Sequence, residues 1–228
     1  MRAMWLAMMV LVLGCTPTHA QTPHGGAALD LEGKTVALVR ATDEGVSAYC
    51  SGVWVADDAF VTANHCVEES TLGDDVLFAT RDDVSALEGD KAAAVRFGKL
   101  EAIDAGHDIA LVRVTLAPAH PVAHVASRQP YVGEDVQTMG HPYGLWWSYS
   151  RGTVAALRVM APFDDDSFWY VQSTAAASPG NSGGGLFDEA GDLVGLCRAT
   201  VVARGAENLN LYVHAMYVSR FLAAHGIT

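Results

Sequence analysis

Short apolar segments separated by Gly, Asp and Pro run through this chain from about residue 35 to residue 214, and no other feature limits its fold so strongly. Segments that alternate apolar and polar residues, or stay apolar between turn residues, are typical of β-strands. They form two groups, at 35–40, 46–55, 59–62, 92–103 and 109–115, and at 136–139, 152–160, 168–172, 193–202 and 209–214. Many short strands at this spacing predict an all-β architecture of two barrels.

The boundary between the barrels is predicted near residues 118–130, where prolines break the strand pattern. We therefore expect a first barrel at about 34–120 and a second at about 130–215, within one domain that spans 34–228. A chain of 228 residues, half of them hydrophobic, is long enough to bury the core of such a domain.

A helix is predicted to close the chain over residues 215–225, because apolar residues recur there at helical spacing. Its buried face would hold Met216, Phe221 and Leu222. The helix follows the last predicted strand directly, so we expect it to cap the second barrel.

The first 20 residues differ from the rest and predict an export signal. Arg2 supplies a positive start, and the apolar run 3–13 is too short to span a membrane. Two cleavage sites compete. Cleavage before Cys15 would give a lipid-anchored protein of the periplasm or cell envelope, whereas cleavage after Ala20 would release the protein. Membrane attachment through a lipidated Cys15 follows from the first alternative, and residues 21–33 are expected to be a flexible segment in either case.

Charge and ligand spacing exclude two classes of partner. The chain has 14 basic and 26 acidic residues and a net charge of −12, so no nucleic-acid partner is expected. The acidic runs at 74–75 and 164–166 lack the spaced ligands of a calcium loop. His107 and His141 have no clustered partners and are interpreted as structural. We predict no metal ion and no cofactor.

Three short segments carry the polar residues needed for nucleophilic catalysis. They are Thr-Ala-Asn-His-Cys at 62–66, His-Asp-Ile-Ala-Leu at 107–111 and Gly-Asn-Ser-Gly-Gly at 180–184. A serine hydroxyl needs a base within hydrogen-bond reach, and His65 would be that base for Ser182. Asp108 would bind the other imidazole nitrogen and fix the tautomer.

The segment around the serine also predicts a binding site for an oxyanion. Glycines there let backbone N–H groups turn inward without interference from a Cβ atom. The site is predicted on the backbone of Gly180, Asn181 and Ser182, with Gly180 and Ser182 as the two main donors.

In this order, and preceded by Cys50-Ser51-Gly52, these segments resemble the trypsin/chymotrypsin-like serine peptidases. Met-Gly-His-Pro-Tyr-Gly-Leu at 139–145 and Arg-Gly-Thr-Val-Ala-Ala-Leu at 151–157 are similar to the protease domain of HtrA/Deg-type bacterial enzymes, as are segments at 172–176 and 192–196. The likeness covers about 34–222. It implies two six-stranded antiparallel β-barrels with a C-terminal helix, an active site between the barrels, and serine endopeptidase activity on polypeptide substrates.

The chain departs from the family pattern at several positions. Asn181 stands where digestive members have an Asp that pairs with a newly cut N-terminus, so we expect no zymogen activation of that kind. Gly185 stands where Pro or Ala is more usual. Arg198 stands in a strand that should line the substrate, where small polar residues are more common. HtrA-type chains usually continue into a PDZ domain, and because this chain ends at Thr228 we expect no regulation through one.

The resemblance also implies a disulfide and a specificity pocket. It pairs Cys50 with Cys66 and leaves Cys197 as a buried free thiol. The residue six positions before the nucleophile, Ala176, would form the base of the pocket.

We expect the pocket to be lined by Ala176, Leu196 and Arg198. Without an acid at its base it would disfavour Lys and Arg and would accept small or medium apolar side chains. Two orientations of Arg198 remain open, toward an acidic side chain of the substrate or toward a carboxylate of the chain such as Asp192.

Two other functions remain as alternatives. A peptidase fold can serve as a catalytically silent binding protein, although the His, Asp and Ser are all present here. An esterase uses the same acyl chemistry, but the Gly-Asn-Ser-Gly-Gly segment is not the Gly-x-Ser-x-Gly elbow of that class.

Overall fold

A computed structural model of the chain describes residues 26–43, 45–86, 95–160, 168–200 and 209–228. The predicted export signal, both cleavage sites and the lipidation candidate Cys15 lie outside these ranges, as does the acidic run 164–166. Within the described ranges, no helix has the length and apolar character needed to cross a membrane.

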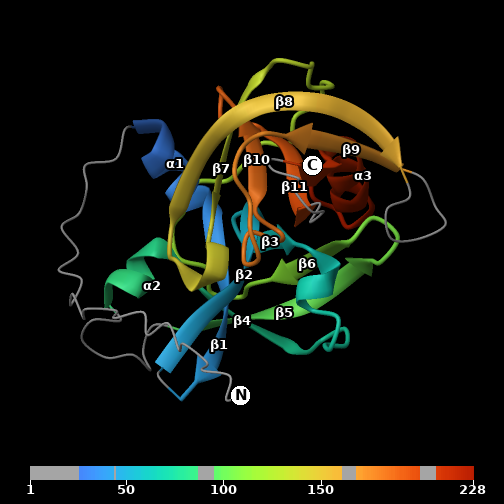
Figure 1. The fold of residues 1–228 in the computed structure, drawn as a ribbon. Helices are drawn as coiled ribbons and strands as arrows, with labels where there is room; N and C mark the ends of the chain where they lie inside the picture. The colour runs from blue at the N-terminus through green and yellow to red at the C-terminus, as the bar shows by residue number, and fades with distance from the viewer. Residues whose placement is uncertain (1–25, 44, 87–94, 161–167, 201–208) are drawn as a thin grey trace, which may run out of the picture.

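Two closed barrels of six antiparallel strands form the molecule, one above the other in Figure 1. The first follows the order β1-β2-β3-β6-β5-β4 and the second β10-β11-β12-β9-β8-β7. The first comprises β1 (Thr35–Thr42), β2 (Gly45–Ala56), β3 (Ala59–Thr62), β4 (Asp75–Ala79), β5 (Arg96–Asp104) and β6 (Ile109–Arg113). The second comprises β7 (Asp135–Gly140), β8 (Ser148–Met160), β9 (Phe168–Ser173), β10 (Gly185–Asp188), β11 (Leu193–Thr200) and β12 (Asn210–His214). The predicted all-β, two-barrel architecture is confirmed.

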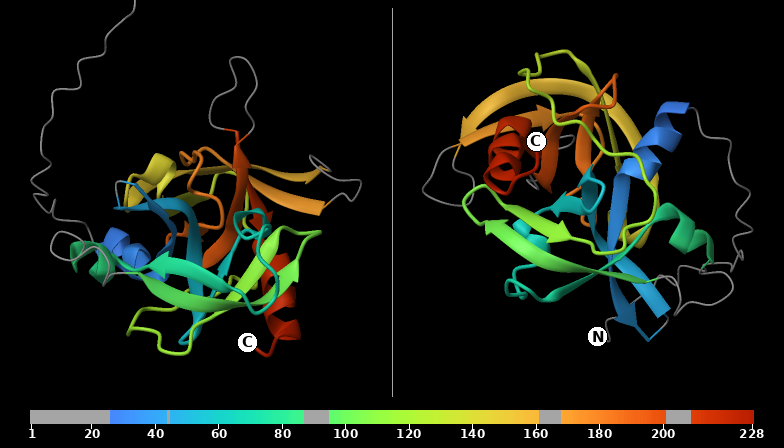
Figure 2. Two further views of the ribbon diagram at one scale, coloured as in Figure 1. Left: turned by 90° about the horizontal axis from the view of Figure 1, so that it is seen from below. Right: turned by 180° about the vertical axis from the view of Figure 1, so that it is seen from behind.

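Helix α3 (Ala215–Ala224) follows β12 directly. Figure 2 shows this helix, in red beside the C-terminus, from two further sides. The predicted C-terminal helix is therefore confirmed. Its buried residues include Phe221 and Leu222, as expected, but Val218 and Ala215 are buried in place of Met216, which is partly exposed.

Each barrel encloses its own apolar interior. In the first barrel Trp54 meets Phe60 and Phe78 edge to face, with ring centroids 5.4 and 5.8 Å apart. All three side chains are fully buried. Edge-to-face contacts of this kind add to the stabilisation that comes from burying the rings.

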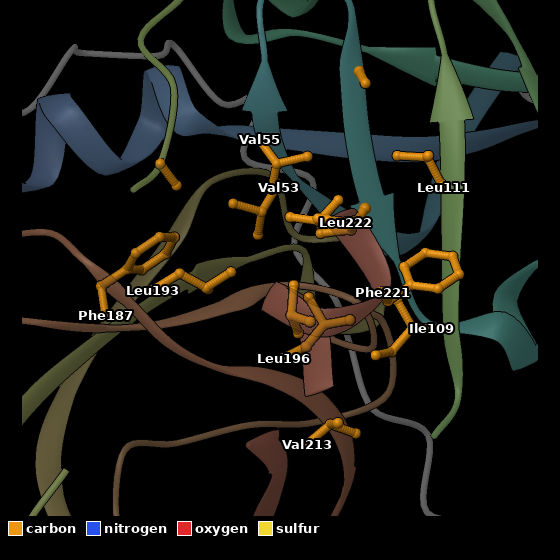
Figure 3. Packing of buried hydrophobic residues seen from close by; sticks show 14 of the residues in the cluster. Val53, Val55, Ile109, Leu111, Phe187, Leu193, Leu196, Val213, Phe221 and Leu222 are labelled. Atoms are coloured by element: carbon orange, nitrogen blue, oxygen red, sulfur yellow. The ribbon is translucent and has the colours of Figure 1, made fainter. Parts of the chain in front are cut away.

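A third cluster fills the space between the barrels and under α3. Figure 3 shows Val53 and Ile109 from the first barrel facing Leu196 and Val213 from the second, with Phe221 of α3 beside them. All but Phe221, which is 7% exposed, are at most 1% exposed. This shared core fixes the two barrels against each other, and therefore fixes the residues that each contributes to a site between them.

Strands β4 and β10 were missed in the sequence pattern. The first begins at Asp75, a residue type common in turns, and only Val76 and Phe78 show the inward alternation. The second has four residues and begins at Gly185, directly after the glycine-rich segment. Both strands are too short for a period of two to be read securely.

The segment before β1 is ordered where we expected flexibility. Residues 26–34 form helix α1 (Gly26–Lys34), and Leu31 is 1% exposed in the cluster between the barrels. The Lys34 ammonium donates to the carbonyl of Gly191 at 3.1 Å, which ties the helix to the second barrel. The expected flexible segment therefore does not include residues 26–33. A short helix α2 (Arg81–Ala86), also not predicted, follows β4.

Candidate active site

His65 lies on a single 3₁₀ turn, Asn64–Cys66, that follows β3. The turn is fastened to β2 by the disulfide between Cys50 and Cys66, so the implied disulfide is present. The two sulfur atoms lie near the His65 ring in an arrangement that resembles a metal site, but cysteines joined in a disulfide have no thiolate to offer. The disulfide therefore positions His65 and does not bind a metal with it.

Asp108 binds His65 at two points. One carboxylate oxygen accepts the His65 main-chain N–H at 2.9 Å, and the other lies 2.8 Å from the ring Nδ1. Asp108 adopts a left-handed backbone conformation, with φ 58°, at the turn before β6, and its carbonyl accepts the N–H of Asn64 at 3.1 Å. The two turns are thus tied to each other by main chain and side chain.

The contact with Asp108 decides which nitrogen of His65 carries the proton. An ionised carboxylate can only accept hydrogen bonds, so Nδ1 must be protonated and Nε2 is left with a free lone pair. The Asp108 side chain is 5% exposed, whereas the His65 side chain is 40% exposed. The basic nitrogen is therefore held on the accessible side of the pair.

Ser182 reaches this region from the loop between β9 and β10. Its carbonyl accepts the N–H of Ser51 at 2.8 Å and lies 3.7 Å from the sulfur of Cys66. Among the residues that the structure describes, no hydrogen bond joins the Ser182 hydroxyl to His65. Such bonds often shorten only when a substrate is bound.

The loop before Ser182 leaves two backbone donors available. Neither the N–H of Gly180 nor that of Ser182 donates a hydrogen bond to another described residue. Asn181 differs, because its N–H donates to the carbonyl of Ser178 at 2.9 Å. The prediction that all three backbone groups form the oxyanion site is therefore wrong for Asn181, whose donor is used within the loop.

The predicted lining of the specificity pocket changes at Leu196. This side chain is fully buried in the cluster between the barrels, where Figure 3 shows it beside Val213, so it cannot line an open pocket. Leu196 and Cys197 face opposite sides of β11, and Leu196 faces the inter-barrel core. Ala176, in contrast, is exposed.

Arg198 turns toward a carboxylate of the chain, which is one of the two orientations that the sequence left open, but the carboxylate is that of Asp108 and not that of Asp192. Its Nε lies 3.6 Å from the Oδ2 of Asp108, and its guanidinium carbon is 6.0 Å from the ring centroid of Tyr170. Asp192 instead pairs with His124 at 3.3 Å. The side chain of Arg198 is only 10% exposed, so it does not line an open pocket.

The other singled-out residues behave as structural groups. Cys197 is a buried free thiol, as predicted, and burial raises its pKa to about 12, so it stays protonated and unreactive. His107 binds the carboxylate of Asp104 at 2.8 Å and stacks on Tyr217. His141 is fully buried against Ser51, a contact that no local sequence signal indicated.

A cavity of about 400 Å³ opens beside His65. Tyr49, Arg40 and Glu68 are among the other residues that line it. His65 thus borders a space that can hold part of a ligand.

Three comparisons relate this chain to known proteins. A family model described as a trypsin-like peptidase domain matches residues 50–196. A Pseudomonas putida protein named "probable periplasmic serine endoprotease DegP-like" is 32% identical over 147 residues, which cover 64% of this chain and 28% of that protein. The serine endoprotease DegS of Haemophilus influenzae is 31% identical over 110 residues, covering 46% of this chain and 32% of that protein. The chain thus spans less than a third of the length of these relatives.

Solved structures show the same fold at lower identity. The Rv3671c protease of M. tuberculosis in its active form superposes with a TM-score of 0.73 at 19% identity, covering 89% of this chain and 85% of that one. An HtrA-type protease with a bound tripeptide gives 0.69 at 22% identity, covering 88% of this chain and 64% of that one.

Proposed function

Because this chain belongs to the trypsin-like peptidase family, we propose that it is a serine endopeptidase that hydrolyses polypeptides through an acyl-enzyme on Ser182. His65 is the general base and Asp108 the group that orients it. One observation carries the proposal: Asp108 accepts both the main-chain N–H and the ring N–H of His65, which leaves the accessible ring nitrogen basic.

Acylation begins when the Ser182 hydroxyl oxygen bonds to the carbon of the scissile carbonyl. His65 Nε2 takes the hydroxyl proton, and the carbonyl electron pair moves onto oxygen. The N–H groups of Gly180 and Ser182 donate to this oxyanion, and each donor contributes about 3 kcal/mol to transition-state stabilisation. The imidazolium that forms is stabilised by the Asp108 carboxylate.

The intermediate then collapses and the acyl group is released. The C–N bond breaks, and the leaving amine takes the proton from His65, which becomes neutral again. Water adds to the acyl carbon while His65 takes a proton from it. The second intermediate expels Ser182, whose oxygen recovers the proton, and a free carboxylic acid leaves.

We infer a preference for small or medium apolar side chains before the scissile bond. Ala176 is exposed at the position expected for the base of the pocket and brings no acid to pair with Lys or Arg.

The proposal includes export to the cell envelope, which the names of the periplasmic relatives and the apolar leader support. Lipidation at Cys15 and release by cleavage after Ala20 predict different mature N-termini. The intact mass of the protein recovered from cells distinguishes them, because a lipidated Cys15 adds acyl chains, whereas cleavage after Ala20 leaves Gln21 first.

Digestion of an unfolded protein, followed by mass spectrometry of the new peptide ends, tests this function. The wild type is expected to give internal cleavages after apolar residues, and Ser182→Ala to give none. Ser219→Ala, an exposed serine on α3, serves as the matched control and should cleave normally. If the wild type binds the unfolded protein without cutting it, the peptidase proposal is contradicted and the alternative of a catalytically silent binding protein is favoured.

A further inference from the structure

The peptide groups on both sides of Gly180 are held from outside their loop. The carbonyl of Pro179 accepts the N–H of Tyr143 at 2.7 Å, and the carbonyl of Gly180 accepts the hydroxyl of Ser51 at 2.8 Å. In a trans peptide the C=O and N–H point in opposite directions. Since Pro179 C=O is fixed toward Tyr143, the Gly180 N–H is directed away from Tyr143. Neither peptide group can rotate without losing one of these bonds.

Ser51 is itself held by His141, whose Nδ1 lies 2.9 Å from the Ser51 hydroxyl oxygen. The hydroxyl has one proton, and the carbonyl of Gly180 can only accept it. His141 must therefore carry its proton on Nδ1 and donate to Ser51. The opposite nitrogen, Nε2, has no hydrogen-bond partner among the described residues, as suits the unprotonated nitrogen of this tautomer.

The surroundings keep His141 neutral and fixed. The side chain is fully buried, and burial lowers its pKa from 6.5 to about 3. The ring meets Trp147 edge to face with centroids 4.5 Å apart and Trp146 at 5.9 Å. A neutral imidazole that cannot turn is a constant donor to Ser51 over the physiological pH range.

The turn at residues 141–144 contacts the loop around Gly180 closely through its backbone. A Cβ atom at Gly180, which has φ 105°, would lie 2.2 Å from the carbonyl oxygen of His141, so only glycine fits there. Tyr143 has a left-handed φ of 52°, uncommon for a residue with a side chain, and its N–H is the one that binds Pro179. The strain in the turn is thus located where the loop is held.

We propose that Ser51, His141 and the main chain of Tyr143 form an oxyanion clamp that fixes the orientation of the Gly180 N–H before any substrate binds. The substrate-free protein is then competent, and no activating partner is needed to order the loop. Ser51 and His141 are positioning residues, since neither touches the reacting atoms. This inference rests on the proposed peptidase function.

The test compares turnover with the binding of a peptide boronic acid, which forms a tetrahedral adduct with an oxygen in the oxyanion site. Losing an oxyanion donor costs about 10²–10³ in kcat, and loosening one through Ser51→Ala should cost about 30-fold. We expect the Ki of the boronate to weaken by the same factor while KM stays within about twofold. His141→Phe keeps a ring but removes the donor, and should give the same loss.

Two comparisons separate positioning from stability. Ser51→Ala/His141→Phe should be no worse than either single variant, because the two side chains act through one contact. Thr35→Val is the matched control. It removes a buried hydroxyl that donates to the carbonyl of Leu31 at 2.7 Å, and it should lower stability without changing kcat or Ki.

Each result points to one conclusion. A Ser51→Ala protein that is less stable but binds the boronate as tightly as the wild type would overturn the clamp and leave the peptidase intact. If the wild type cuts peptides or binds the boronate only after another peptide ligand is added, the proposal that the oxyanion site is formed before substrate binds is overturned. A wild type that neither cuts peptides nor binds the boronate under any condition would overturn the proposed function itself.

Discussion

The Nε of Arg198 lies 3.6 Å from Oδ2 of Asp108, the same carboxylate oxygen that faces Nδ1 of His65 at 2.8 Å. Both side chains of the ion pair are buried, with Arg198 10% and Asp108 5% exposed. The Asp108 carboxylate is therefore partly compensated by the Arg198 guanidinium even while His65 is neutral. Buried charges of this kind are coupled, because removing one partner changes the cost of burying the other.

A double-mutant cycle on Arg198→Met and Asp108→Asn should reveal this coupling. We expect an interaction free energy of about 2 kcal/mol in the unfolding free energies measured with urea. The exposed pair Lys99 and Asp75, with side chains 59% and 54% exposed, is the control and should couple by about 0.5 kcal/mol or less. Equal, small couplings in the two cycles would show that the Arg198 contact contributes nothing specific.

Loss of the disulfide should destabilise the His65 turn. Cys50 and Cys66 are 16 residues apart, and closing a loop of this length contributes about 3 kcal/mol by the chain-entropy estimate. Cys50→Ala/Cys66→Ala should lose about that much unfolding free energy, and dithiothreitol should have the same effect on the wild type. Cys197→Ala keeps the disulfide and should stay sensitive to the reductant; insensitivity of the wild type would contradict the prediction.

Because the pKa of His141 is lowered in the folded protein, we expect the unfolding free energy to fall in acid. Its pKa is about 3 in the folded protein and near the ordinary 6.5 when unfolded, so the unfolded chain binds the proton first. The contribution is complete above pH 6.5 and is lost as the pH falls from 6.5 toward 3. We expect a decrease of about 2.5 kcal/mol between pH 6 and pH 4 from this group.

The comparison with His141→Asn isolates that contribution. The variant should show a flatter dependence of unfolding free energy on pH, because asparagine does not titrate, while His214 and the carboxylates continue to titrate in both proteins. Parallel curves for wild type and variant would mean that His141 binds its proton as readily in the folded protein as in the unfolded chain.

An acid at the base of the pocket should change the preferred residue before the scissile bond. Ala176→Asp would place a carboxylate where a Lys or Arg side chain could reach it, so we expect the ratio of kcat/KM for Lys over Leu substrates to rise at least about tenfold. Ala27→Asp, on the exposed first turn of α1, adds the same charge far away and should leave the ratio unchanged. An unchanged ratio in Ala176→Asp would place the pocket elsewhere.

Most strands and the local segments of the candidate site could be predicted from sequence, because both depend on neighbours along the chain. The turns with His65 and Asp108 each follow or precede a strand that the apolar pattern marks clearly. Strands β4 and β10 begin at Asp75 and Gly185, residues typical of turns, and are too short to correct that impression.

The contacts that sequence analysis missed join distant parts of the chain. Ser51 binds His141 across 90 residues and Gly180 across 129, and Arg198 meets Asp108 only because β11 packs against the first barrel. Leu196 appeared suited to a pocket by composition, but its strand faces the inter-barrel core at that position. Such relations depend on how the barrels pack, which no local pattern specifies.

The most direct test of the account is covalent labelling of the purified protein with a fluorophosphonate, measured by intact mass and peptide mapping. We predict one adduct per molecule on Ser182 without any added ligand, none on Ser182→Ala, and labelling of His65→Ala slowed by about 10³-fold or more. No adduct on the wild type, or an adduct on another residue, would contradict the assignment of Ser182 as the nucleophile.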